Sequence, residues 1–320
     1  MKKIYGAMLA CAFLFVPGFI GAQEISAAGG STYAMPFLAI DISPRNLAMG
    51  GVAAAVSPDA YAHFGNVAAV SFSDSFMDVG VSYCLRQPSW QLSNSAVAAS
   101  SFRVGKKLGL MFGVLSDIGR AYGITDENGM VGGTFVPVDI RAGAGVSYMV
   151  ADFMSVGAAV NYAGSRLSGI SGSSGASDAV FADVQVLFKV KDFTFSLKGS
   201  NLGMPVKSVS GMSHWLPMNG SAGAGYCASF GRHSISAGLE AGLFFGGRAA
   251  FAGGIGAEYV FSDIIALRTG YHYGSERSPA PSFASVGAGC KFKGLRLDLA
   301  WLIAGCAMRN TISAGVGYSF

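Results

Sequence analysis

Four histidines, His63, His214, His233 and His272, are the first candidates for catalysis or metal binding in this chain. No two of them have the spacing of a metal-binding pair. The serines lack the Gly-x-Ser-x-Gly turn of a hydrolase nucleophile. The glycine run from Gly253 to Gly256 falls within a predicted strand and does not open a helix, so it is no nucleotide motif. The sequence therefore predicts no catalytic residue, no metal site and no cofactor, and the chain is interpreted as a non-enzyme.

Ionised side chains lie at alternate positions of otherwise apolar segments, and these are the second candidates. Clear examples are Arg141, Asp183, Arg268, Arg296 and Asp298. A cation facing lipid at mid-depth costs about 2–4 kcal/mol, so such charges are expected to point into the lumen of a barrel. One interpretation is a wet lumen whose charges pair with one another and with a plug. The other is a path for a solute or a proton relay.

The C-terminal segment shows which elements would carry these charges. Ile312, Ala314, Val316 and Tyr318 alternate with small or polar residues, and the chain ends on Phe320. A strand with one apolar face, ending at an aromatic residue, is typical of transmembrane β-barrels.

Composition favours the same class. The chain is 51% hydrophobic and 12% charged, and its 46 glycines suit closely spaced strands with a crowded interior. Beyond the N-terminus no run of 18 apolar residues could form a membrane helix. The net charge of +4 is small and scattered, which excludes a nucleic-acid surface.

Residues 1–22 are interpreted as a secretory signal peptide, with Lys2 and Lys3 before an apolar core. The cleavage site is expected between Ala22 and Ala28, and a membrane anchor is the alternative. Four cysteines remain after cleavage, with no Cys-x-x-Cys spacing. Export would permit disulfides, and unpaired thiols are the alternative. These cysteines are Cys84, Cys227, Cys290 and Cys306.

Residues 75–320 predict an all-β fold, a 14-stranded antiparallel transmembrane β-barrel. The connections alternate between tight turns, such as Lys191-Asp192 and Gly231-Arg232, and longer loops, such as 118–136 and 167–177. Outer-membrane barrels have their short turns in the periplasm and their long loops outside. The predicted strands are 75–84, 92–104, 107–117, 137–150, 153–166, 178–190, 193–203, 216–230, 233–245, 249–261, 264–274, 283–292, 295–306 and 311–320.

Residues 23–74 form an N-terminal arm that we interpret as a lumen plug. Ser57-Pro58-Asp59 predicts a helix start, with Pro58 at the first helical position and helical turns to Phe64, before Asn66. Fourteen strands enclose a lumen too wide for barrel side chains to fill, since about eight strands already give a packed interior. A periplasmic arm and an extra strand are the alternatives.

The run from Phe37 to Asn66 resembles the N-terminal signature of the PorV/PorQ family. Asn201-Leu202-Gly203 is similar to that family and to the wider FadL-type transporters. The resemblance implies a FadL-like barrel in the outer membrane of Bacteroidota-type bacteria. Characterised members serve type IX secretion, where PorV-type barrels receive the C-terminal signal domain of exported proteins. Asn66-Val67-Ala68 stands where the family usually has Asn-Pro-Ala.

Two functions follow from the resemblance. The first is a non-enzymatic component or cargo-binding adaptor of type IX secretion, with cargo proteins or other secretion subunits as partners. Its candidate binding loop holds Met204, Met212, His214 and Trp215, although Trp215 could equally be an interfacial anchor. The alternative is an outer-membrane transporter of hydrophobic small molecules such as fatty acids. The inward-facing Phe181, Leu187, Phe244 and Leu302 would allow an apolar pocket for that ligand.

Overall fold

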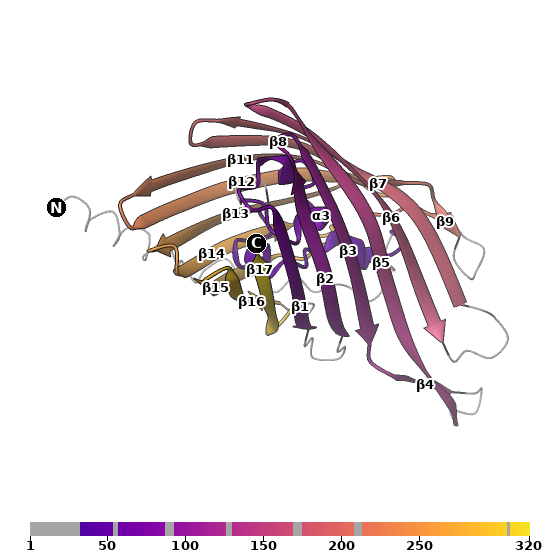
Figure 1. Ribbon diagram of the computed structural model, residues 1–320. Helices are drawn as coiled ribbons and strands as arrows, with labels where there is room; N and C mark the ends of the chain where they lie inside the picture. The colour runs from indigo at the N-terminus through magenta and orange to yellow at the C-terminus, as the bar shows by residue number, and fades with distance from the viewer. Residues whose placement is uncertain are drawn as a thin grey trace.

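The computed structural model describes residues 33–53, 57–86, 93–125, 130–168, 175–207, 213–305 and 308–320. The expected signal peptide, its expected cleavage sites, Met212 and Cys306 lie outside these ranges. The expected 14-stranded antiparallel barrel is confirmed in the part that is described (Figure 1). The ring closes where β1 pairs with β17, as in the register Val81 to Val316.

The barrel strands follow the predicted segments closely. Their bounds are β1 (Met77–Arg86), β2 (Ser93–Val104), β3 (Leu108–Gly119), β5 (Val131–Ala151), β6 (Met154–Ser168), β7 (Gly175–Val190), β8 (Phe193–Gly203), β11 (Met218–Phe230), β12 (His233–Phe245), β13 (Ala250–Phe261), β14 (Ile265–Gly274), β15 (Phe283–Phe292), β16 (Leu295–Ala304) and β17 (Thr311–Ser319). Each pairs antiparallel with its neighbours, and β3 pairs with β5 directly. Short strands β4 (Tyr122–Thr125), β9 (Val206–Lys207) and β10 (Ser213–His214) lie outside this ring.

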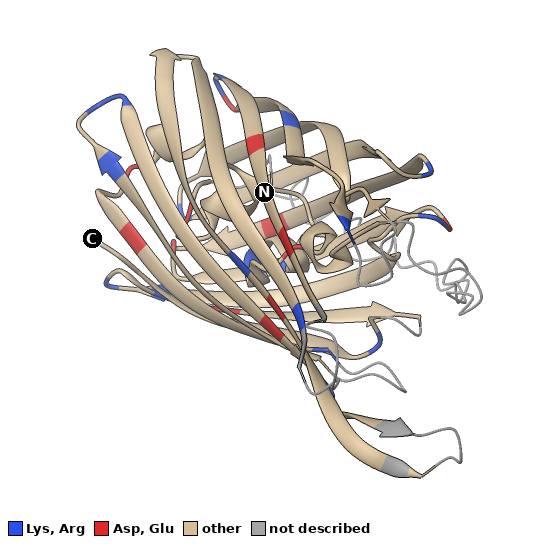
Figure 2. Ribbon diagram, turned by 90° about the vertical axis from the view of Figure 1, so that its right-hand side faces the viewer, with Lys and Arg blue, Asp and Glu red and all other residues tan. Residues whose placement is uncertain are grey.

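The two faces of the wall differ as the two-residue period predicts. On β17, Ile312, Val316 and Tyr318 are exposed, whereas Thr311 and Ser313 are buried. Large apolar side chains are exposed on strand after strand, as with Leu239, Leu267 and Leu297. In Figure 2, long stretches of the strands carry no charge, and blue and red segments recur at the turns. A closed barrel with an apolar outer face belongs in an outer membrane.

One end of the barrel consists of tight turns. Gly105, Lys191, Gly231 and Lys293 have positive φ values there, between 48° and 64°. Such residues make compact hairpin turns whose twist matches that of the strands. The end with the short turns is the periplasmic end of bacterial barrels. We call it the turn end, and we call the other end the loop end.

The stretch from Tyr33 to Ser73, apart from residues 54–56, lies inside the barrel, and we call it the insert. It contains η1 (Pro36–Ala39), α2 (Pro44–Ala48), α3 (Ala62–Gly65) and η2 (Val70–Phe72). Helix α2 packs against β14 to β17, and α3 packs against β2, β3 and β5. Figure 1 shows α3 enclosed by the strands. No helix in the described residues has the length and apolar character needed to span a membrane.

Two local predictions were wrong. The helix expected at Pro58 begins at Ala62, because the Asp59 carboxylate accepts the N–H of Tyr61 at 2.8 Å and makes a turn instead. The helix that begins on a Ser-Pro pair is α2, where the Ser43 hydroxyl accepts the N–H of Asn46. The loop predicted at 118–136 is largely a hairpin, in which Tyr122 pairs with Phe135.

Candidate functional site

The insert lies directly on the backbone of β13 and β14. A Cβ on Gly270 would come 2.2 Å from the amide nitrogen of Gly50, and one on Gly256 would come 2.2 Å from the carbonyl oxygen of Met49. Gly50 itself has a φ of 69°. Only glycine permits both the close approach and this conformation. These glycines therefore set the depth and position of the turn that follows α2.

Near the turn end, ion pairs join the insert to the wall. Arg45 of α2 contacts Glu258 of β13 at 2.5 Å, and Glu258 contacts Arg268 of β14 at 2.6 Å. Arg268 reaches Asp298 of β16 at 2.7 Å. Asp298 also contacts Arg296 at 2.9 Å, and Arg296 lies 3.6 Å from Asp59 of the insert. The structure thus connects three predicted lumen charges, Arg268, Arg296 and Asp298, in one continuous series of ion pairs, which we call the ion-pair chain.

The remaining two predicted lumen charges form a second group nearer the loop end. Arg141 of β5 contacts Asp183 of β7 at 2.7 Å, and Asn161 of β6 donates to the same carboxylate oxygen at 2.9 Å. The guanidinium of Arg141 also lies 5.0 Å from the ring centre of Phe64 in the insert. Next to Arg141, His63 Nε2 lies 2.9 Å from the Asn161 side-chain oxygen. This group therefore holds α3 against the wall.

The strand β8 leaves the regular ladder beside Asp183. Ala182 pairs with Leu202 whereas Val184 pairs with Gly199, so β8 carries one additional residue at this point. The backbone N–H of Asn201, whose φ is 57°, donates to Asp183 at 2.7 Å. The Asn201 side chain donates to the carbonyls of Leu38 and Pro217 at 3.3 and 3.1 Å. The Asn-Leu-Gly motif is thus a β-bulge that fixes the start of the insert.

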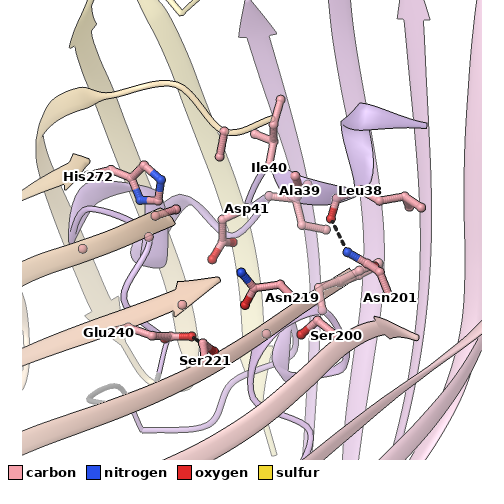
Figure 3. Close-up of a pocket in the computed structure, with 18 of the residues that line it drawn as sticks. Leu38, Ala39, Ile40, Asp41, Ser200, Asn201, Asn219, Ser221, Glu240 and His272 are labelled. Carbon is pink, nitrogen blue, oxygen red and sulfur yellow. Dashed lines mark hydrogen bonds between the residues drawn. The ribbon is translucent and has the colours of Figure 1, made fainter. Parts of the chain in front are cut away.

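Between the insert and the wall on this side lies a cavity of about 150 Å³, which we call the outer cavity. Its apolar lining includes Phe37 and Ile40 from the insert and Phe244 and Phe283 from the barrel. Figure 3 shows Asp41 and Asn219 facing each other across part of it, with Ser200 nearby. The charged or polar lining residues are Asp41, Arg141, Asp183, Lys198, Ser200, Asn201, Asn219, Ser221, Glu240 and His272.

A second cavity of about 400 Å³ opens near the turn end, and we call it the inner cavity. Charged side chains such as Asp78, Lys189 and Lys291 line it, along with part of the ion-pair chain. Among the described residues, none lines both cavities, and the insert contributes to each. The insert therefore lies between the two.

Two titratable groups of the insert have shifted pKa values. Burial raises the pKa of Asp41 to about 6, although the N–H of Ser43, the Asn46 side chain and Lys198 oppose the shift. Burial, with the nearby positive charge of Arg141, lowers the pKa of His63 to about 4. At neutral pH the cavity therefore contains an ionised Asp41, and His63 is neutral.

The three predicted plug residues all lie within the insert. Pro58 and Asn66 line the inner cavity, and the Asn66 side chain donates to the Ala53 carbonyl at 3.0 Å. Its side-chain oxygen accepts from Gln185 of β7 at 3.0 Å. Asp59 is buried against Ser101 of β2, whose hydroxyl donates to the Asp59 carbonyl at 3.2 Å. These contacts hold Asn66 against β7 and Asp59 against β2.

The predicted partner-binding residues lie at the loop end. Met204 is 80% exposed and Trp215 is 39% exposed. His214 belongs to the small β9–β10 pair. The Trp215 carbonyl accepts the N–H of Ala34 at 2.8 Å, so its backbone also holds the first residues of the insert. The inward apolar residues Phe181, Leu187, Phe244 and Leu302 are all buried, as predicted.

Sequence reasoning missed Asp41 and Asn219, which the tertiary structure brings to the outer cavity. Asp41 follows a short apolar run and could have been singled out as a lone carboxylate. Asn219 carries no such signal, because it is one polar residue at the start of a strand. Among the described residues, no group of three His, Cys, Asp or Glu side chains could hold a metal ion. Cys84, Cys227 and Cys290 are free thiols.

No family model matches the sequence, and no curated protein matches it. Solved structures do match the fold. The Ralstonia pickettii toluene transporter TbuX is 16% identical, with a TM-score of 0.63 over 88% of this chain and 99% of that one. The monoaromatic hydrocarbon channel CymD is 13% identical, with a TM-score of 0.64 over 88% and 98%. A Pseudomonas aeruginosa FadL homologue is 13% identical, with a TM-score of 0.51 over 88% and 96%.

These likenesses define the class of fold, which is that of the FadL-like outer-membrane barrels. At such identities they show the fold alone. TbuX is named as a transporter and CymD as a channel, and neither is named as an enzyme. The narrower resemblance to PorV/PorQ rests on the sequence motifs alone.

Proposed function

We propose that this protein is an outer-membrane channel that takes up a small hydrophobic compound, with the insert acting as its plug. The observation that carries this proposal is the outer cavity, which Phe37, Phe244 and Phe283 line between the insert and the wall. Its volume of about 150 Å³ suits a single ring. In another protein an engineered apolar cavity of about 150 Å³ binds benzene. The toluene and monoaromatic channels of the same fold support the same ligand size.

The size of the outer cavity argues against a long acyl chain as the bound ligand. A fatty acid would have to extend beyond the cavity, past the insert or along the wall. The bulge of β8 at Asn201 lies at the edge of this cavity, where the regular ladder is interrupted. A compound of single-ring size needs only a local displacement of the insert to pass toward the inner cavity.

Filling the outer cavity tests this proposal. Ala252 is buried and lines the cavity, so we expect Ala252→Phe to reduce toluene binding and uptake at least tenfold. Ala222→Phe on the outer face is the matched control, because Ala222 is exposed. Both would be measured with purified protein in vesicles, by binding and by entry of radiolabelled toluene. Uptake by Ala252→Phe at the wild-type rate would contradict the proposal.

A second candidate function is cargo binding in type IX secretion. The exposed Met204 and Trp215 at the loop end favour it, since adaptable apolar groups suit a protein partner. The test is deletion of the gene in its own host, with type IX cargo secretion and toluene uptake measured together. Loss of secretion with normal uptake would support this role and oppose transport.

A further inference from the structure

The outer cavity holds one carboxylate without a matching cation. Asp41 lies between η1 and α2, and its oxygen accepts the N–H of Ser43 at 2.9 Å. Two positive charges act on Asp41 from beyond ion-pair distance, and each already has a carboxylate partner: Lys198 is bound to Glu240 at 2.7 Å and Arg141 to Asp183 at 2.7 Å. In the described residues no cation lies within ion-pair distance of Asp41.

The other charges around the cavity cancel in pairs. Arg141 and Asp183 form one pair, and Lys198 and Glu240 form the other. His272 of β14 stacks on Phe283 and has its Nδ1 3.3 Å from the Gly50 carbonyl. An ordinary imidazole, with a pKa of about 6.5, is neutral at pH 8. The ionised Asp41 therefore leaves the cavity with a net negative charge at that pH.

Two further polar groups face the same space without partners. The side chains of Asn219 on β11 and Ser200 on β8 line the cavity, and within the described residues neither side chain makes a hydrogen bond. Figure 3 shows the Asn219 side chain beside Asp41 and Ser200 on the far side of Asn219. A carboxylate, an amide and a hydroxyl together can accept several hydrogen bonds from one ligand group. The remaining wall is aromatic and aliphatic, with Phe37, Phe244 and Phe283.

We propose that the outer cavity selects a single-ring primary amine, bound with its ammonium group on Asp41 and its ring against the phenylalanines. The ammonium would donate to Asp41, Asn219 and Ser200, and charge-assisted hydrogen bonds are the stronger kind. A neutral alcohol would make weaker bonds, and a carboxylate would be repelled by Asp41. This inference rests on the proposed function and names the ligand class of the same cavity.

Four ring compounds of similar size test the proposal: benzylamine, benzyl alcohol, toluene and benzoate. Binding to the purified full chain in detergent would be measured by calorimetry at pH 8, where benzylamine carries a positive charge. We expect benzylamine to bind at least ten times more tightly than toluene, and benzoate to bind most weakly. Benzoate binding as tightly as benzylamine would overturn the inference.

Substitution of Asp41 separates charge recognition from shape. Asp41→Asn should weaken benzylamine binding at least tenfold and affect toluene binding far less. Asp152→Asn, at an exposed turn residue, is the control and should change neither. If toluene binds but benzylamine binds no better, this inference fails and the proposed function stands. If none of the four compounds binds, the proposed function fails as well. The wild-type affinity ratios distinguish these outcomes even if Asp41→Asn does not fold.

Discussion

Buried arginines in this barrel contact carboxylates on other strands. The side chains of Arg141 and Asp183 are each only 7% exposed, whereas those of Arg166 and Asp178 are 39% and 52% exposed. Removing one partner of a buried pair leaves an uncompensated charge, which costs about 3–5 kcal/mol. An exposed pair contributes about 0–1 kcal/mol. The two Arg–Asp pairs, which both involve β7, therefore allow a matched comparison.

We predict that Arg141→Met lowers the free energy of unfolding by about 3–5 kcal/mol, because Asp183 stays buried without its cation. Arg166→Met should lower it by no more than about 1 kcal/mol. Urea unfolding in lipid vesicles, followed by tryptophan fluorescence, measures both. Equal losses for the two variants would show that burial does not set the energy of these pairs.

Asp41 gives a pH-dependent prediction. Its pKa is raised from 3.8 to about 6, so its contribution to stability is fully present below pH 3.8 and is lost as the pH rises through 6. Asp41→Asn should therefore stabilise the protein at pH 8 by about 3 kcal/mol, at 1.36 kcal/mol per pKa unit. The gain should shrink to nearly zero at pH 3.5. Thermal unfolding of both proteins across this pH range checks the sign of the effect. A gain in stability that does not change with pH would contradict the prediction.

At the scale of elements, the position of the insert depends on close contact between backbones. Gly256 and Gly270 let the turn after α2 rest on β13 and β14, and Arg45 then reaches Glu258. Side chains at these positions would occupy the space of Met49 and Gly50. The many glycines of the chain thus serve the insert as well as the packing of strands.

We predict that Gly270→Leu displaces the insert, because even the added Cβ would lie 2.2 Å from its backbone. The variant should conduct ions in planar bilayers at least several times better than wild type if the insert is a plug. Gly220→Ala is the control, since its Cβ would meet only a Phe245 ring carbon at 3.7 Å. Unchanged conductance together with increased proteolysis of residues 33–73 would argue against the plug.

At the scale of the whole molecule, one closed wall separates hydrocarbon from ionised groups. Leu239 is 52% exposed in the middle of β12, and its neighbour Glu240 points inward to Lys198. A charge at a lipid-facing position near mid-depth costs about 2–4 kcal/mol. The alternation of apolar and polar residues along β12 is therefore required by the lipid on one face as much as by the lumen on the other.

We predict that Leu239→Arg reduces the folding free energy in vesicles by about 2–4 kcal/mol, while Leu239→Met changes it by less than about 1 kcal/mol. Folding yield and urea midpoints in vesicles provide the measurement. In detergent micelles, which deform easily around a charge, the two variants should differ less. An arginine tolerated without cost in vesicles would show that this face does not meet lipid.

The sequence by itself determined the barrel, the direction of its side chains and most of its strand limits, although it missed the hairpin that β4 forms with the first residues of β5. Alternation is a local property. Whether a residue such as Val316 or Asp298 points to the lipid or to the lumen therefore follows from its position in its own strand, whichever strand it pairs with. The turn at Gly231 was predictable for the same reason, because its conformation depends on a few adjacent residues.

Only the tertiary structure decided the contents of the lumen. Nothing in the chain shows that Asp41 lies in one cavity with Asn219, or that Arg45 meets Glu258, because closure of the ring and the strand register set these distances. The Ser-Pro pair at residue 43 starts a helix, whereas the pair at residue 57 does not. There the Asp59 carboxylate accepts a hydrogen bond from the N–H of Tyr61 and lies near Arg296. The candidate site is built from such long-range contacts, and a local pattern carries no information about them.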